Sequence, residues 1–380
     1  MALLTPETVP AYVAARLGDG ARYTTAEEIN GGNLNFAFKV ADESGGALFV
    51  KQSPDFIKVF GPEAKLHRER LELEMNVYKQ WQTLLGEEAS KKFLPKIFDV
   101  DIAEMACIME FLGSYRLLDE QLFAGNISES VAIGIGEFMA SIHSKSHSTH
   151  IPSAEVDRLT ESFKNAKLRN IQLEYVFSKA FRESDRAAAL REDAAFMTEL
   201  EEIKAKYRGE NLQDLALLHG DLHPGSAMSD ADTVKIIDPE FAIYGPPGLD
   251  LGSMISGYVL AYVFHTAAGN DVASKIPPAI EKMWETYKTS MEAAGVGSDT
   301  ISGISEDAVG FTGCEVARTA LGFAGVRGLP IKDEGVKAKA EEAALGLAQR
   351  CIMGRKGRGM QFMMEEIKKF SLRGRFCAIL

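Results

Sequence analysis

The sequence predicts an α+β protein with a small N-terminal lobe, made of an antiparallel β-sheet and one main helix, and a larger, mostly helical C-terminal lobe. Two observations predict this fold class. Short β-rich runs separated by polar turns fill the first part of the chain, and helical patterns fill most of the rest. We expect the lobes to span residues 1–112 and 113–380. Two lobes of this kind predict a cleft, the usual place for a small-molecule site.

In the small lobe, Thr5 followed by Pro6 and Glu7 is typical of a helix start. The strands are expected in residues 27–51, where a polar hairpin connection at 42–46 joins two β-rich runs, and at 96–101 and 106–111. The main helix is expected at 63–85, a stretch dense in Glu, Leu, Lys and Arg.

In the large lobe, a loop-and-strand region at 216–248 interrupts the helical patterns. The expected helices are 128–146, 155–182, 185–208, 250–268, 277–294, 305–325, 334–352 and 359–370.

The bulk composition excludes several classes of protein. With 380 residues and 46% hydrophobic content, the chain can bury a sizeable core. A net charge of −12 argues against a nucleic-acid partner but not against a small-molecule partner such as a nucleotide. The four cysteines form no CxxC pair, which fits a reducing compartment, so we expect a cytoplasmic protein without zinc or disulfides. No apolar run reaches the ~18 residues of a membrane span, and the N-terminus is not that of a signal peptide.

The most informative motifs are His-Gly-Asp-Leu-His-Pro-Gly-Ser at 219–226 and Ile-Ile-Asp-Pro-Glu-Phe at 236–241. They place two acidic centres, Asp221 and Asp238, 17 residues apart (238 − 221). Phosphoryl transfer needs one carboxylate to accept the proton of the attacking hydroxyl and another to hold Mg²⁺ on the phosphates of ATP. We therefore predict Asp221 as the catalytic base and Asp238 as a metal ligand. The turn Asp-Pro-Glu, in place of the Asp-Phe-Gly of protein kinases, points to a kinase of small molecules.

The neighbours of these two residues have less specific roles. Glu240 is predicted as a metal ligand, with contact through water and bracing of the turn as alternatives. Ser226 stands five residues past the base (226 − 221), where the kinase pattern has a metal-binding Asn, so a weak or water-mediated contact is expected. His219 is expected to support the loop. His223 is open between support and metal binding.

A glycine-rich turn in the small lobe predicts phosphate contacts, because glycines let backbone amides approach phosphate oxygens. An ordinary turn is the alternative. The candidate residues are Gly31, Gly32, Asn33 and Asn35.

Lys51 ends the β-rich run after this turn and is predicted to bind the α- and β-phosphates, the alternative being a solvated edge lysine. Either Glu72 or Glu74 can pair with it, because these two residues lie on different faces of the helix. We favour Glu74. Other charges of this helix, including those of Arg68, Glu69 and Arg70, are expected on a solvated face.

The segment Met109-Glu110-Phe111-Leu112 closes the last strand of the small lobe. In a two-lobed kinase this position is the hinge, so Glu110 and Leu112 are expected to offer backbone groups to the adenine edge. The expectation rests on position alone.

Taken together, these motifs resemble the 5-methylthioribose kinase family, within the aminoglycoside phosphotransferase and choline kinase branch of the protein-kinase-like fold. The resemblance runs from about residue 5 to about residue 350. The quoted matches are 219–226, 238–252, 32–35, Lys51-Gln52 and 136–143. The resemblance implies a bilobal protein-kinase-like fold with ATP and Mg²⁺ as cofactors. It also implies phosphorylation of the 1-hydroxyl of 5-methylthioribose in methionine salvage, an acceptor contact from Arg318, a bracing role for Asp250 and a possible homodimer.

The departures from the family pattern fall where the acceptor is expected. The family's tandem Arg-Arg is Arg318-Thr319 here, its later His is Gly325, and its Phe-Thr-Asp-Pro-Tyr segment is 177–181, Phe-Ser-Lys-Ala-Phe. Neither Thr nor Lys replaces a guanidinium. A related kinase acting on another sugar or alcohol is therefore the alternative, and a non-catalytic nucleotide-binding protein is the competing class.

The C-terminal residues Cys377-Ala378-Ile379-Leu380 fit a prenylation box, with Lys368, Lys369, Arg373 and Arg375 upstream. A four-residue pattern often arises by chance, so we expect no membrane anchor.

Overall fold

Two units make up the fold in this computed structural model, which describes residues 2–18, 22–29, 32, 34–209 and 213–373. The first unit comprises Met1–Arg116 and Lys235–Glu240, and the second comprises Leu117–Val234 and Phe241–Leu380. The segment that carries Asp238 and Glu240 therefore belongs to the first unit, although the sequence analysis places it in the C-terminal lobe.

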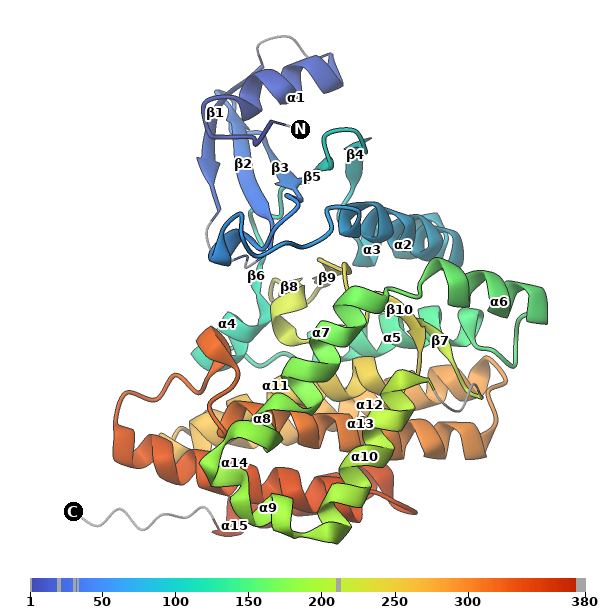
Figure 1. The fold of residues 1–380 in the computed structure, drawn as a ribbon, viewed down its shortest axis with the longest axis vertical. Coiled ribbons are helices and arrows are strands. Elements are labelled where there is room, and N and C mark those ends of the chain that lie inside the picture. The colour runs from blue at the N-terminus through green and yellow to red at the C-terminus, as the bar shows by residue number, and fades with distance from the viewer. Residues whose placement is uncertain (1, 19–21, 30–31, 33, 210–212, 374–380) are drawn as a thin grey trace. The chain divides into compact units, whose positions relative to one another are not determined.

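A five-stranded antiparallel sheet forms the centre of the first unit, in the order β1-β2-β3-β5-β4 (Figure 1). Its strands are β1 (Tyr23–Glu28), β2 (Phe36–Asp42), β3 (Ala47–Gln52), β4 (Ile97–Asp101) and β5 (Ala106–Glu110). The register pairs Lys51 with Ala37 on β2 and with Cys107 on β5. Lys51 thus lies on a central strand, which excludes the solvated edge lysine of the sequence analysis.

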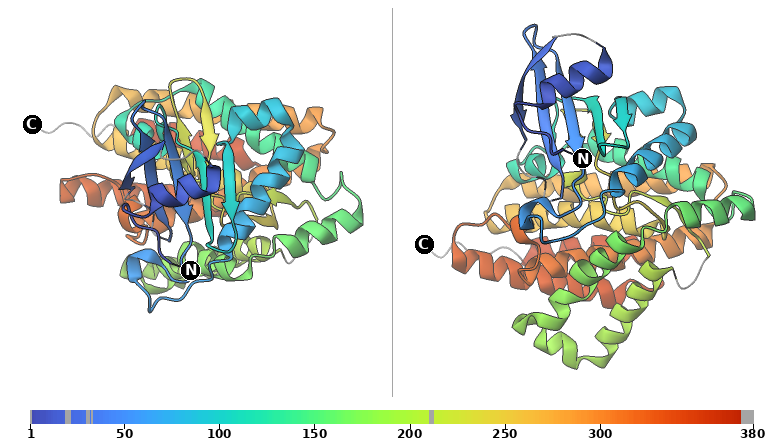
Figure 2. Two further views of the ribbon diagram at one scale, coloured as in Figure 1. Left: turned by 90° about the horizontal axis from the view of Figure 1, so that it is seen from above. Right: turned by 45° about the horizontal axis from the view of Figure 1, so that its top comes forward.

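Helix α1 (Val9–Leu17) packs on the sheet, as both views in Figure 2 show. Its buried Val9 and Val13 join a core cluster with Phe38, Val40 and Val50 of the sheet. The alternation of buried and less buried residues along β2 is the period-2 pattern of a strand with one core face.

Helices α2 (Arg70–Leu85) and α3 (Glu87–Phe93) complete the first unit. The main helix was expected to begin at residue 63. This start is wrong by about two turns, because α2 begins at Arg70. The residues before Arg70 form irregular structure after the 3-10 turn Lys58–Phe60. Their backbone is held by single contacts such as Leu66 N–H to Asp55 O (3.1 Å).

The second unit is mostly helical, as predicted. Its helices are α4 (Leu118–Ala124), α5 (Glu129–Ser146), α6 (Ser153–Ser162), α7 (Ala166–Phe177), α8 (Lys179–Glu183), α9 (Ala188–Glu192), α10 (Ala194–Arg208), α11 (Gly248–Ala267), α12 (Ile276–Ala293), α13 (Ser298–Ala320), α14 (Glu334–Gly354) and α15 (Gly359–Arg373). The short strands near the two motifs are β6 (Arg116–Leu117), β7 (Ala216–Leu218), β8 (Ala227–Ser229), β9 (Val234–Ile236) and β10 (Ile243–Gly245), of which β7 and β10 pair antiparallel.

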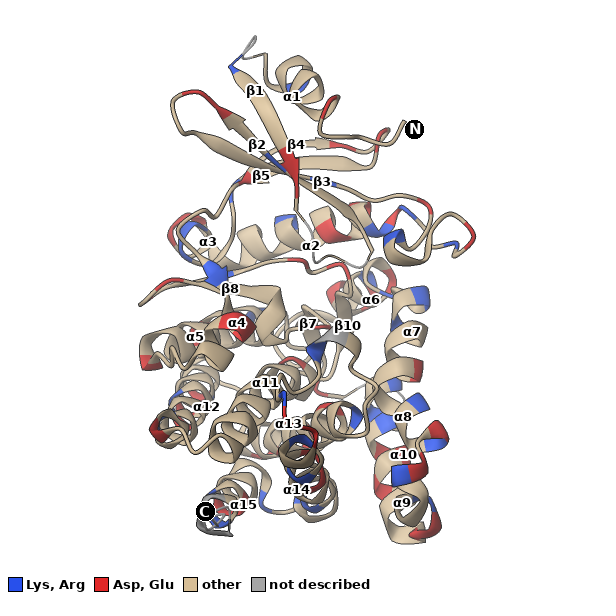
Figure 3. Ribbon diagram, turned by 90° about the vertical axis from the view of Figure 1, so that its left-hand side faces the viewer, with Lys and Arg blue, Asp and Glu red and all other residues tan. Residues whose placement is uncertain are grey.

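The helices expected at 155–182 and 185–208 are each divided into shorter ones. Helix α6 ends at Ser162, and Asn165, which has a left-handed backbone (φ 41°), directly precedes α7. Asp193 caps α10 by accepting hydrogen bonds from the backbone N–H groups of Ala195 and Phe196. Acidic and basic residues both occur along α10, so this helix has no single-sign surface (Figure 3).

Close contact between α11 and α13 fixes the start of α11. A Cβ at Gly252 would lie 2.6 Å from Ala308 O, and one at Gly248 would lie 2.8 Å from Ala308 N, so only glycine allows this approach. Asp250 lies between these glycines, in the first turn of α11. Among the described residues, no helix is both long and apolar enough to cross a membrane.

Candidate active-site residues

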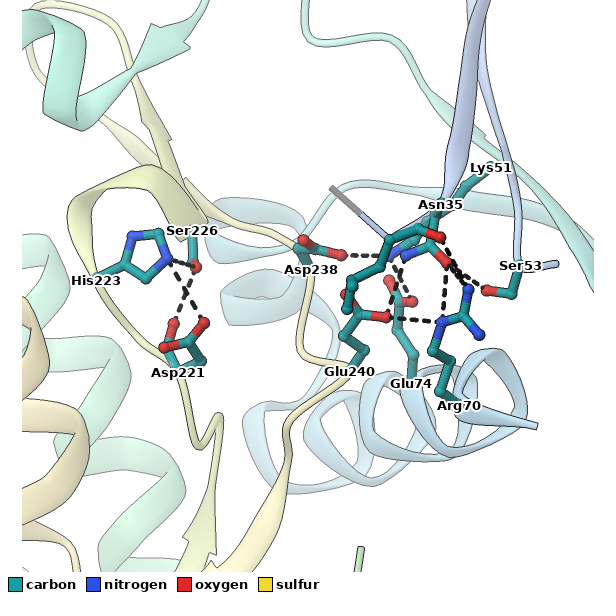
Figure 4. A network of polar contacts seen from close by, with 11 residues as sticks. Asn35, Lys51, Ser53, Arg70, Glu74, Asp221, His223, Ser226, Asp238 and Glu240 are labelled. Carbon is teal, nitrogen blue, oxygen red and sulfur yellow. Dashed lines mark hydrogen bonds and ion pairs between the residues drawn. The ribbon is translucent and has the colours of Figure 1, made fainter. Parts of the chain in front are cut away.

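Lys51 is the centre of a buried charge cluster in the first unit. Its Nζ donates to Glu74 Oε2 (2.7 Å) and also contacts the Asp238 carboxylate (Figure 4). Burial opposes the ammonium charge, but the carboxylates of Asp238, Glu74 and Glu240 outweigh it and hold the pKa of Lys51 well above its usual value. Lys51 is therefore a cation fixed by carboxylates, which is the state required for binding phosphate.

Glu74, not Glu72, is the helix residue that meets Lys51. Glu74 is buried on the inner face of α2, whereas Glu72 is exposed. Burial raises the pKa of Glu74 to about 8, with the Lys51 ammonium opposing the shift and Asp238 and Glu240 adding to it. The cluster thus places three carboxyl groups, those of Glu74, Asp238 and Glu240, around the cations of Lys51 and Arg70.

Arg70 corrects the prediction of a solvated face. Its side chain is buried, and all five of its N–H groups donate to acceptors within this unit. The acceptors are Asn35 Oδ1 (3.0 and 2.8 Å), Leu34 O (3.0 Å), Pro54 O (2.8 Å) and His67 O (2.8 Å). Because α2 begins at Arg70 itself, the carbonyl of His67, which a longer helix would have used internally, accepts from the Arg70 side chain instead.

Glu240 faces Arg70 and Asn35. Its Oε2 accepts from Asn35 Nδ2 (3.1 Å) and lies 3.4 Å from Arg70 Nε (Figure 4). Burial raises the pKa of Glu240, while Lys51 and Arg70 oppose the shift. Oε2 thus takes part both in a hydrogen bond from Asn35 and in an ion pair with Arg70. Bracing of the turn, one alternative of the sequence analysis, thus has direct structural support.

Asp238 differs from Glu240 in exposure and in backbone. Its side chain is 49% exposed, and its backbone is left-handed (φ 63°), a conformation that Asp adopts more readily than most residues. A hard, partly exposed carboxylate fits a Mg²⁺ ligand. The described residues contain no group of three or more His, Cys, Asp or Glu arranged to hold a metal, so phosphate oxygens and water would have to complete the coordination.

Of the predicted glycine turn, the structure describes Gly32, Leu34 and Asn35, while Gly31 and Asn33 lie outside the described residues. Asn35 is buried and receives Ser53 Oγ–H (2.8 Å) in addition to Arg70. At the expected hinge, Glu110 N–H donates to Lys96 O (2.8 Å). A contact between Glu110 and an adenine edge would therefore use its carbonyl oxygen.

In the second unit, Asp250 braces the loop that carries Asp221. Its Oδ2 accepts from His219 N–H (2.8 Å) and its Oδ1 from Gly220 N–H (2.9 Å). His143 Nε2 lies 3.4 Å from the same carboxylate, and His143 Nδ1 lies 3.1 Å from Tyr287 Oη. Gly220 has φ 83°, and a Cβ there would lie 2.1 Å from Phe241 O. This backbone shape is therefore available only to glycine.

His223 and Ser226 lie beside Asp221 (Figure 4). His223 Nδ1 accepts from Gly225 N–H (2.8 Å), and its Nε2 lies 3.3 Å from Ser226 Oγ and 3.6 Å from Asp221 Oδ2. Burial, followed by the charges of Arg327 and Arg318, holds the pKa of His223 well below its usual value. A neutral ring with its hydrogen on Nε2 has no lone pair left for a metal, so support of the loop is the better interpretation. Ser226 Oγ donates to Asp221 O (2.9 Å).

Near the end of α13, Arg318 Nη2 pairs with the buried Glu315 Oε2 (2.9 Å). Burial raises the pKa of Glu315, and the Asp221 charge adds to the shift. Arg318 Nε is buried without a hydrogen-bond partner among the described residues. Thr319 Oγ1 donates to Glu315 O (3.1 Å), and Gly325 has φ 58° with open space at its Cβ position.

The sequence pattern does not reveal two buried residues that contact the candidate site residues, Arg70 and Gln172. In the sequence, Arg70 is one of several charges on a helix expected to face solvent. Gln172 contacts the Asp221 loop from α7, and no motif marks it.

The chain is similar to known proteins over almost its whole length. Residues 25–279 match the phosphotransferase enzyme family. A methylthioribose kinase of Geobacillus kaustophilus (strain HTA426) is 31% identical over 383 residues, covering 92% of this chain and 93% of that protein. The chain belongs to the methylthioribose kinase family. Methylthioribose kinase 2 of Oryza sativa subsp. japonica, 28% identical over 389 residues, covers 90% of the chain and 89% of its own length.

Membership in the methylthioribose kinase family confirms the resemblance found in the sequence, and the fold agrees with it. A choline/ethanolamine kinase family protein from Mesorhizobium loti has a TM-score of 0.50 at 12% identity, covering 95% of this chain and 98% of that one. This likeness and the family match confirm the predicted protein-kinase-like fold, with an antiparallel sheet in one unit and mostly helices in the other.

Proposed function

We propose that this protein transfers the γ-phosphoryl group of ATP to the 1-hydroxyl of 5-methylthioribose or a close analogue, a reaction of methionine salvage. The observation that carries this proposal is the presence of Lys51, Asp221 and Asp238 together in a member of the methylthioribose kinase family. A nucleotide-binding protein without catalysis would more often have lost one of the three.

In the proposed reaction, the acceptor oxygen forms a bond to the γ-phosphorus while the bond from that phosphorus to the β–γ bridging oxygen breaks and ADP leaves. Asp221 accepts the proton of the acceptor hydroxyl. Lys51 neutralises the α- and β-phosphates. Arg318 binds the acceptor, for which its buried, unpartnered Nε–H is a suitable donor.

Asp238 would hold Mg²⁺, which, when bound, would neutralise charge on the phosphates. The Asp238 carboxylate also contacts Lys51, so the proposed metal ligand and the proposed phosphate-binding cation lie side by side. Glu240 would contribute to the metal site either through Oε1 or by holding the turn through Arg70.

ADP release from Mg-ATP tests the proposal, with methylthioribose, ribose analogues, 5-deoxyribose and amino alcohols as acceptors. Turnover strongest with methylthioribose supports it. Turnover with none of these acceptors, although ATP binds, would instead support a non-catalytic nucleotide-binding protein.

The acceptor site supports a second candidate, a kinase of the same fold acting on a different sugar or alcohol. Thr319 and Gly325 replace a guanidinium and an imidazole of the family pattern, and Thr319 is buried with its hydroxyl bonded to the Glu315 carbonyl. Turnover restricted to another acceptor in the same assay would favour this candidate.

Two further expectations belong to this proposal. A homodimer is expected from the family, and light scattering on the purified protein measures it. A cytoplasmic location is expected from its role in metabolism, and cell fractionation measures that.

A further inference from the structure

Gln172 reaches the loop of the proposed base from helix α7. It is buried, and its Nε2 donates to Gly220 O (2.7 Å) and to Asp221 Oδ1 (3.3 Å). The longer contact is near the limit of a hydrogen bond, and the amide nitrogen carries two hydrogens, one for each acceptor. One side chain therefore contacts both the backbone before the base and the carboxylate of the base.

The orientation of the Gln172 amide follows from its neighbours. Gly220 O can only accept, so the nitrogen of the amide must face it. On the other side, Tyr207 Oη lies 2.8 Å from Gln172 Oε1 and can donate to it. Tyr207 is fully buried on α10 and packs against Phe177 of α7 with ring centroids 4.8 Å apart. The one hydroxyl hydrogen of Tyr207 has a second acceptor in Arg169 O (3.1 Å), so Gly220 O sets the orientation of the amide and Tyr207 Oη is a compatible partner for its oxygen.

Other hydrogen bonds described above hold the backbone around Asp221. Asp250 accepts the N–H groups of His219 and Gly220, and Ser226 Oγ donates to Asp221 O. Gln172 supplies the contact that these leave out, the donor to Asp221 Oδ1. With Oδ1 held in this way, Oδ2 is the oxygen that faces His223 and is left to receive a proton.

We propose that Gln172 is a positioning residue for the catalytic base Asp221, and that Tyr207 acts through Gln172 by holding its amide oxygen. This inference rests on the proposed function for the role of Asp221. It assigns to Gln172 and Tyr207 an effect on turnover rather than on nucleotide binding, because their contacts described above are with the loop of the base and its neighbours in the second unit.

The test uses the full-length variants Gln172→Leu and Tyr207→Phe, with Tyr262→Phe as the matched control. Tyr262 also carries a buried hydroxyl bonded to a carbonyl, that of Ile367 (3.4 Å), but away from the loop. We expect kcat to fall about tenfold to 100-fold in Gln172→Leu and less in Tyr207→Phe, because a small misplacement of a reacting group has effects of this size. The KM for Mg-ATP, the affinity for ADP and the melting temperature should stay close to those of the control.

The same substitutions in an Asp221→Asn background separate positioning from a structural role. Residues that act through one group are non-additive, so Gln172→Leu should have no further effect on the residual rate there. An equal loss in both backgrounds, or a kcat that stays at the wild-type value, would overturn the inference. If wild-type protein phosphorylates no acceptor, the proposed function fails. The inference is then decided by a crystal structure of Gln172→Leu, which supports it if the Asp221 carboxylate has moved and overturns it if not.

Discussion

Lys51 Nζ lies 2.7 Å from Glu74 Oε2, and both side chains are buried. This pair keeps the ammonium in one place between β3 and α2, within the first unit. Since Asp238 contacts the same ammonium, the nucleotide phosphates would meet a cation that already has two carboxylate partners.

The first prediction concerns this pair. Glu74→Gln should raise the KM for Mg-ATP about tenfold, because the amide cannot hold the ammonium by charge, while the KM for the acceptor changes little. Glu72→Gln, on the exposed face of the same helix, is the control. Steady-state kinetics with each substrate varied measures both constants. Equal Mg-ATP constants for the two variants would contradict the assigned role.

Arg70 gives a prediction about stability and nucleotide binding together. Arg70→Met removes five hydrogen bonds and the ion pair with Glu240, leaving buried acceptors without a donor, so we expect a loss of about 3 kcal/mol in the free energy of unfolding. The KM for Mg-ATP should also rise, since Asn35 and the Asp238 turn lose a common anchor.

The control for Arg70→Met is Lys79→Met, which removes one exposed cation from the same helix. Urea titration and kinetics on both variants compare them. If Arg70→Met unfolds at the same urea concentration as Lys79→Met, the network has no part in stability.

Gly220 tests the shape of the base loop. Gly220→Ala places a Cβ 2.1 Å from Phe241 O at φ 83°, so we expect both a large loss of activity and destabilisation on the order of 3 kcal/mol. Gly269→Ala also has a positive φ (68°) but open space around its Cβ, so it should cost only about 1 kcal/mol and leave activity intact. Melting temperatures and kcat of Gly220→Ala and Gly269→Ala separate the effect of backbone strain from that of the contact with Phe241 O. Similar values for both variants would show that this contact has no effect of its own.

His147 predicts a pH dependence of stability in the second unit. Its ring is fully buried, and burial lowers its pKa to about 4, with Asp214 opposing the shift and His150 and His143 adding to it. Because unfolded His147 binds a proton near its ordinary value of about 6.5 and the folded one does not, stability should fall as the pH drops from about 6.5 to about 4.

In His147→Asn, this slope should shrink by on the order of 1 kcal/mol per pH unit. His67→Asn, at an exposed histidine of the first unit, is the control. Urea titrations between pH 4 and 7 measure the slopes. A slope unchanged from wild type in His147→Asn would show that another group carries the dependence.

The sequence predicted the parts of this protein that depend on local pattern. Four strands of the sheet, most helices of the second unit and the two acidic motifs have signatures of spacing or composition that a single sequence shows. The first strand is an exception, because β1 (Tyr23–Glu28) lies mostly before the expected start at residue 27. Family membership confirms the kinase assignment that those motifs suggested.

What the sequence did not show depends on tertiary contacts. Arg70 looked like one charge among several, because nothing in a helical pattern reveals that α2 begins at that residue and that carbonyls from the preceding loop surround it. Gln172 is a neutral side chain in a helix without a motif, and only the folded chain brings it to Gly220, 48 residues later. The roles assigned to Gly31 and Asn33 remain predictions.

The central claim is phosphorylation of methylthioribose with Asp221 as the base. Its most direct test is phosphorus NMR of the product formed from Mg-ATP and methylthioribose by wild type, Asp221→Asn and the exposed control Asp232→Asn. We expect a sugar 1-phosphate from wild type and from the control, and at least ~100-fold slower formation by Asp221→Asn. No sugar phosphate from wild type, or equal rates in all three proteins, would contradict it.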